Sequence, residues 1–276
     1  MTDQPKVSQR GVPAVVQRVL HSGRVWTIQG VGTLLLLAVG YGWLWMREAH
    51  WWQLAVSALL ALLIAYLAAF LQRTALRIYR RDRLGAVGAP PPVPGGARPR
   101  RAVREWLPGA AIVFVLFLAV AWASGAIDDR MPDAMQVAAS WLTLHLRRPV
   151  DPTRLQQRWE TIDFLLPWFF FVILWLPPAA AALLGEAAIW GAALRAWRKL
   201  RYWLGTLACA AVGYVTFVKL AGWVPEVRGL GAQTMSMVAR VGLGYVILLG
   251  SWLVTLALVE ESIAGHRAVS PDETWD

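Results

Sequence analysis

The stretch WQLAVSALLALLIAYLAAFL, residues 52–71, decides the fold class, because its 20 residues contain no charged side chain. An α-helix needs about 20 apolar residues to cross the roughly 30 Å hydrocarbon layer of a bilayer. Five further apolar runs of similar length occupy residues 28–46, 107–127, 163–184, 203–223 and 236–259. We therefore predict an all-α, polytopic membrane helical bundle with about six transmembrane helices.

The composition agrees with this class. The chain of 276 residues is 57% hydrophobic and 16% charged, with a mean hydropathy of +0.47. Soluble domains carry about 25% charged residues, so a disordered chain, a collagen-like fibre and a disulfide-stapled secreted module are excluded. The single cysteine, Cys209, lies inside an apolar run, and no intrachain disulfide can form.

The basic residues predict how the chain is threaded. Of the 27 arginine and lysine residues, 18 lie in the N-terminal segment, residues 72–106, residues 185–202 and the C-terminal tail, and 7 lie in the opposite loops. Basic loops stay on the cytoplasmic side, so both termini are expected in the cytoplasm. The arginine, alanine and glycine bias indicates a bacterial inner-membrane protein. The net charge of +10 is then explained by basic residues that are sorted to one side of the membrane. No nucleic acid partner is expected.

A proline- and glycine-rich stretch, GAVGAPPPVPGGARP at 85–99, cannot sustain a helix and divides the chain. We expect a cytoplasmic N-terminal segment (1–27) with an interfacial helix at 12–20. A two-span hairpin (28–71), a cytoplasmic linker (72–106), a four-span bundle (107–259) and a cytoplasmic tail (260–276) follow. The linker arginines keep this segment on the cytoplasmic side of the membrane. Alternatively, they dock a partner or anionic lipid headgroups.

Residues 131–147 are expected to form an amphipathic helix outside the spans. Its polar side chains recur at helical spacing on one narrow stripe, comprising Asp133, Gln136, Ser140, Thr143 and Arg147. The helix is expected to lie on the outer leaflet or to cover the outer mouth of the bundle.

The fourth span contains Pro167, Pro177 and Pro178. Proline lacks the backbone N–H and kinks a helix, and in lipid the freed carbonyls need another donor. We predict a helix break here, interpreted as a structural kink or, alternatively, as a discontinuity that binds a transported substrate.

Three charged residues, Asp163, Lys219 and Arg240, lie near the predicted outer boundary. Unpaired charges inside a bilayer are unfavourable, so we predict that the three residues meet in an outer charge cluster. The alternative is that the long side chains of Lys219 and Arg240 each extend separately to the membrane surface. Ser57, Ala61, Ala65 and Ala69 form a small-residue stripe that allows close helix packing.

Motifs for catalysis are missing from the sequence. There is no HExxH, CxxC, GxSxG or P-loop pattern, and the four histidines are scattered. We therefore predict no catalytic residues, no cofactor and no metal site.

The leading hypothesis is a multi-pass inner-membrane protein without catalytic machinery, acting as a subunit, scaffold or assembly factor beside other membrane subunits. The alternative is a transport permease, for example the membrane subunit of an ATP-driven exporter with a separate ATPase chain. That ATPase would contact candidate docking residues Arg73, Arg77, Arg80, Arg81 and Arg83. A third hypothesis is an intramembrane lipid-modifying enzyme that uses the region of Asp163.

Overall fold

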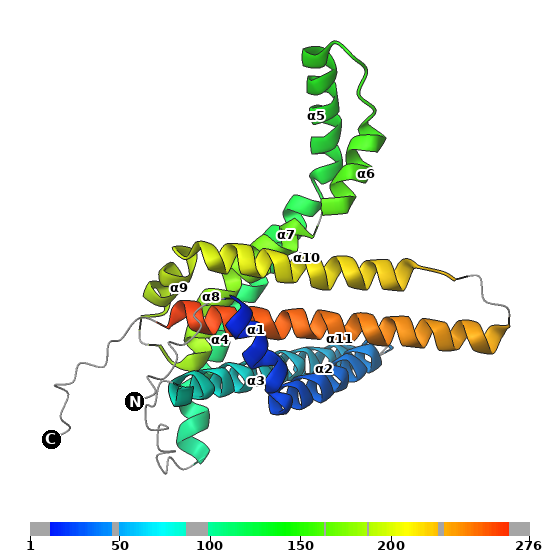
Figure 1. The fold of residues 1–276 in the computed structure, drawn as a ribbon. Helices are drawn as coiled ribbons and strands as arrows, with labels where there is room; N and C mark the ends of the chain where they lie inside the picture. The colour runs from blue at the N-terminus through cyan, green and yellow to red at the C-terminus, as the bar shows by residue number, and fades with distance from the viewer. Residues whose placement is uncertain are drawn as a thin grey trace, which may run out of the picture.

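The computed structural model describes residues 12–45, 50–86, 99–162, 164–186, 188–225 and 229–264. These residues form helices and short connections, and no strand occurs among them. Six of the helical segments are long and apolar enough to cross a membrane (Figure 1). The prediction of an all-α bundle with about six candidate spans is therefore confirmed.

The elements are α1 (Val12–His21), α2 (Gly23–Leu44), α3 (Trp51–Ala86), α4 (Pro99–Asp128), α5 (Met131–Leu146), α6 (Pro152–Ile162), α7 (Leu165–Pro167), the π-helix η1 (Trp168–Trp175), α8 (Leu176–Leu184), α9 (Ile189–Trp197), α10 (Leu200–Gly222) and α11 (Leu230–Ile263). The fourth candidate span consists of α7, η1 and α8 in sequence. The other five are α2, α3, α4, α10 and α11.

The six spans form three antiparallel pairs. Helix α2 packs on α3, α4 packs on η1 and α8, and α10 packs on α11 along most of its length. Figure 1 shows α2 and α3 beside α11, whereas α4 crosses the other helices and leads away from them. The pairs therefore meet closely over only part of their length.

Buried side chains concentrate where α3, α8 and α11 end and where α1 and α9 lie, which we call the basic end of the bundle. All residues of the range 176–183 in α8 and of the range 253–260 in α11 are buried. At the opposite end large apolar side chains are exposed, for example Leu35 at 62% and Met235 at 77%. The core thus joins the three pairs at one end and leaves the other end open.

The predicted linker at 72–106 is shorter in the structure. Helix α3 contains 36 residues and is therefore about 54 Å long, longer than a bilayer core. It continues as a helix because Leu76 and Tyr79, three residues apart, are both fully buried, so this part is amphipathic. Residues 99–106 belong to α4, and residues 87–98 lie outside the described part of the chain.

Both predicted amphipathic segments are helical. Helix α1 buries Val15 and Val19 and packs against α11. Helix α5 forms a hairpin with α6, and Figure 1 shows this hairpin projecting away from the other helices. It does not cover the end of the bundle, which was one of the two expected positions.

Two glycines show how closely the pairs pack. A Cβ atom at Gly109 of α4 would lie 2.8 Å from the carbonyl oxygen of Ala182, and one at Gly213 of α10 would lie 2.9 Å from Cβ of Ser251. Atoms at such short distances would have to move apart. Glycine at these positions allows the close helix approach that is common in membrane proteins.

We predict that Gly109→Ala lowers the free energy of unfolding in detergent by about 1–3 kcal/mol, because the neighbouring atom belongs to the backbone. Gly125→Ala in the same helix is the matched control, since nothing lies within 4 Å of its added Cβ. Alanine there favours the helix by up to about 1 kcal/mol. Thermal unfolding curves of the two variants check this, and equal stability would contradict the packing described.

Candidate functional site

The fourth span changes its helical repeat inside the apolar region. Pro167 ends α7, a π-helix runs from Trp168 to Trp175, and Pro177 and Pro178 lie in the first turn of α8. π-Helical segments are rare and frequently mark functional sites. The three prolines that predict a helix break therefore lie at both ends of an irregular segment.

The two adjacent prolines leave carbonyl groups without helical donors. An N–H at residue 177 would bond the carbonyl of Ile173 in an α-helix or that of Val172 in a π-helix. In the structure Trp197 Nε1 donates to Ile173 O at 2.7 Å, and Tyr202 Oη donates to Val172 O. Side chains of α9 and α10 thus replace the missing donors.

Further hydrogen bonds attach the π-helix to its neighbours. Trp168 Nε1 donates to Thr206 Oγ1 at 3.3 Å, and Trp175 Nε1 donates to the carbonyl of Val113 in α4 at 3.1 Å. Trp168 and Trp197 therefore both serve as internal hydrogen-bond donors. The irregular segment is therefore held on both sides.

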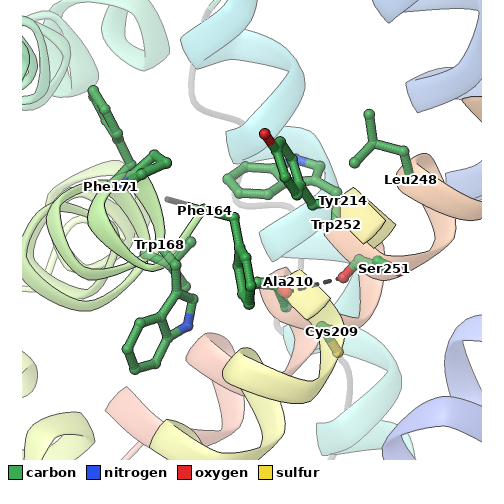
Figure 2. Close-up of a pocket in the computed structure, with 12 residues that line it drawn as sticks. Phe164, Trp168, Phe171, Cys209, Ala210, Tyr214, Leu248, Ser251 and Trp252 are labelled. Carbon is green, nitrogen blue, oxygen red and sulfur yellow. Dashed lines mark hydrogen bonds between the residues drawn. The ribbon is translucent and has the colours of Figure 1, made fainter. Parts of the chain in front are cut away.

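A pocket of about 260 Å³ lies between η1, α10 and α11. Figure 2 shows Phe164, Trp168 and Phe171 on one side of it and Tyr214 and Trp252 on another. Its polar groups are the hydroxyls of Tyr214, Ser251 and Thr255, the Trp168 and Trp252 indole N–H groups and the thiol of Cys209. None of the described residues that line it is acidic, basic or a histidine. Such a pocket suits an apolar group rather than a charged substrate.

Ion pairs surround the basic end and form what we call the collar. Arg83 Nη2 lies 3.1 Å from Glu260 Oε1, and its Nε donates to both oxygens of that carboxylate at 3.2 Å. Arg80 pairs with Glu186 at 2.8 Å. Glu260 is only 1% exposed, so the collar joins α3 to α11 through a buried carboxylate.

Two cations bind the carbonyls that end α11. Lys199 Nζ donates to Ser262 O at 2.7 Å, and Arg195 Nε donates to Ile263 O at 3.0 Å. The last carbonyls of a helix lack intrahelical donors and carry partial negative charge. Burial, with the nearby charge of Arg201, lowers the pKa of Lys199 below its ordinary value.

The candidate docking arginines occupy different environments. Arg80 and Arg83 belong to the collar, Arg73 is half-buried, and Arg77 and Arg81 are exposed. Only the two exposed side chains present their charge freely to the surroundings of the bundle. Sequence reasoning missed Glu186 and Glu260 as partners of the collar.

Two of the three residues of the predicted outer charge cluster lie among the described residues. Lys219 lies in the last turn of α10, and Arg240 Nη1 donates to the carbonyl of the next residue, Leu220, at 3.3 Å. The Arg240 guanidinium also lies 6.0 Å from the ring centroid of Trp223. The two basic residues are therefore at the same end of the α10–α11 pair. Asp163 lies outside the described residues, so the cluster stays a prediction.

The comparisons with known proteins give no assignment. No family model, curated protein or solved structure matches the chain. Among the described residues, no three histidine, cysteine, aspartate or glutamate side chains group closely enough to hold a metal ion. The geometry of the pocket and the collar therefore carries the functional interpretation.

We predict that Trp197→Phe lowers the free energy of unfolding by about 1–3 kcal/mol, because the carbonyl of Ile173 loses its donor. The loss should be smaller in a Pro177→Ala, Pro178→Ala background, where backbone N–H groups return. A double-mutant cycle measures this coupling. Trp190→Phe, at a residue 59% exposed, is the control, and identical losses in both backgrounds would contradict the proposed replacement of donors.

We predict that Glu260→Gln destabilises the protein by about 2–3 kcal/mol, because it removes one partner of a buried ion pair. Glu261→Gln is the matched control: its carboxylate pairs with Arg201 at 3.0 Å but its side chain is 20% exposed, and a loss below about 1 kcal/mol is expected. Chemical unfolding in detergent compares them. Equal losses would show that burial of Glu260 has no energetic consequence.

Proposed function

We propose that the protein is a non-catalytic subunit, scaffold or assembly factor of a membrane complex. In this proposal the end of the bundle opposite the collar packs against another membrane-embedded chain. The basic end would face the cytoplasm of a bacterial cell, in keeping with the positive-inside rule. Support comes from a comparison of glycines in the two halves of the spans, which differ in how close other atoms of the chain lie to them.

Gly205 and Gly250, toward the basic end, have close neighbours within the chain. A Cβ at Gly205 would lie 2.9 Å from Leu258, and one at Gly250 would lie 2.9 Å from Trp26. Gly40, Gly42 and Gly242, in the other half of α2 and α11, have nothing within 4 Å of such an atom. Each glycine disfavours a helix by about 1 kcal/mol relative to alanine, and a close contact with a second chain would account for that.

The lining of the pocket also supports a non-catalytic role. Proton transfer and nucleophilic attack inside a membrane need positioned ionisable groups, which are unfavourable there and therefore informative. The pocket beside the π-helix is lined by aromatic rings and by Ser251, Thr255 and Cys209, and the indole N–H groups of Trp168 and Trp252 donate to residues outside it. The acidic residues of the collar are instead bound by arginines.

The test is purification of the tagged protein from its native membrane in a mild detergent, with co-purifying chains identified by mass spectrometry. We predict a stoichiometric membrane partner, whose recovery falls about tenfold with Gly42→Leu and Gly242→Leu. A small-residue contact between membrane helices contributes about 1–2 kcal/mol, and the larger side chain prevents it.

Ala119→Leu is the control, because Ala119 is an exposed residue of α4, a helix that contains neither Gly42 nor Gly242. It should leave recovery of the partner unchanged. A protein that purifies alone, or a partner that the two glycine variants retain in full, would overturn the proposed interface.

A transport permease is the second candidate, favoured by the π-helical interruption beside a membrane pocket. In that case the exposed Arg77 and Arg81 at the end of α3 would contact a separate ATPase. The same purification distinguishes the two proposals, since a permease subunit would bring a stoichiometric nucleotide-binding chain with it.

A further inference from the structure

A second apolar opening lies on the other side of the fourth span, between α3 and α4. This lateral crevice has a volume of about 420 Å³. Its walls include Ala65, Ala69 and Gln72 on α3 and Ala110, Phe114 and Phe117 on α4. Part of the small-residue stripe predicted on α3 therefore lines an opening instead of packing against a helix of this chain.

The floor of the crevice is held in place by hydrogen bonds. Trp252 of α11 lines it and donates from Nε1 to Gln72 Oε1 at 3.1 Å. Trp175 of η1 also lines it and is bonded to the carbonyl of Val113 at 3.1 Å. The opening is thus formed by fixed aromatic side chains, as in preformed sites of 300–1,000 Å³ for apolar ligands.

Basic residues follow the part of α3 that lines the crevice and precede the part of α4 that lines it. Counting from Ala69 along α3, Arg73 and Arg77 follow at intervals of four and eight residues, which lie on one helical face. Arg80, further along, is bound to Glu186 in the collar. Helix α4 carries Arg100, Arg101 and Arg104 in the turns that precede Ala110. The acidic residues in these two stretches are Asp82 and Glu105, so positive charge exceeds negative charge there.

We propose that the lateral crevice binds an anionic phospholipid. An acyl chain lies between α3 and α4 against Trp252 and Trp175, and the phosphate lies beside Arg73 and Arg77 of α3. Basic pockets between membrane helices bind anionic headgroups in this way. The proposal holds whether or not the chain has a protein partner, because its site is separate from the exposed glycines of α2 and α11.

Native mass spectrometry of the purified full chain tests the site with two probes, phosphatidylglycerol and phosphatidylcholine with identical acyl chains. We expect preferential retention of phosphatidylglycerol. Arg73→Gln and Arg77→Gln should each reduce that preference about fivefold. Arg198→Gln, an exposed arginine near α9, is the control and should leave it unchanged. Arg77→Gln alone keeps this comparison valid if the half-buried Arg73 is needed for folding.

Two variants narrow the crevice, Ala69→Leu and Ala110→Leu, and both should reduce retention of either lipid. Ala58→Leu, at an exposed position of α3 outside the crevice, should not. Equal retention of the two lipids by the wild-type chain would overturn the proposal. So would unchanged retention in a folded crevice variant, or crosslinking of a partner helix to Gln72 or Phe114 in place of lipid.

Discussion

A carbonyl group inside a bilayer must find a hydrogen-bond donor, and this requirement organises the fourth span. Pro177 and Pro178 withdraw two backbone donors at membrane depth, where water does not replace them. The side chains of Trp197 and Tyr202 supply donors to Ile173 and Val172 instead. The π-helix η1 is thereby joined to α9 and α10, and α8, which follows η1, is the buried centre on which α3, α4 and α11 pack.

Hydrogen bonds, ion pairs and apolar burial coincide at the basic end. The carboxylate of Glu260 is held by Arg83, and the carbonyls that end α11 are held by Lys199 and Arg195. The opposite end has no comparable set of contacts among the described residues, and its helices expose large apolar side chains. A bundle joined at one end leaves openings between its helix pairs, and Trp252 lines both of them.

The candidate site was only partly predictable from the sequence. The prolines mark the irregular segment of the fourth span, because loss of an N–H is a property of the residue itself. Nothing local indicates that Trp197 and Tyr202 restore the bonds, or that Arg83 meets Glu260 across 177 residues of sequence. The arginines of residues 73–83 looked equivalent in the sequence, yet two of them are used in the collar and two are exposed.

The sequence by itself determined the six apolar helices, the amphipathic helices α1 and α5, and the sorting of basic residues. Length, hydropathy and helical periodicity are local properties of a chain, and the bilayer selects for them directly. Only the tertiary structure decided that α3 continues as a helix to Ala86, that the fourth span contains a π-helix, and that a pocket and a crevice flank Trp252. These features depend on contacts between residues far apart in sequence, whose pairing follows from packing and hydrogen-bond satisfaction in three dimensions.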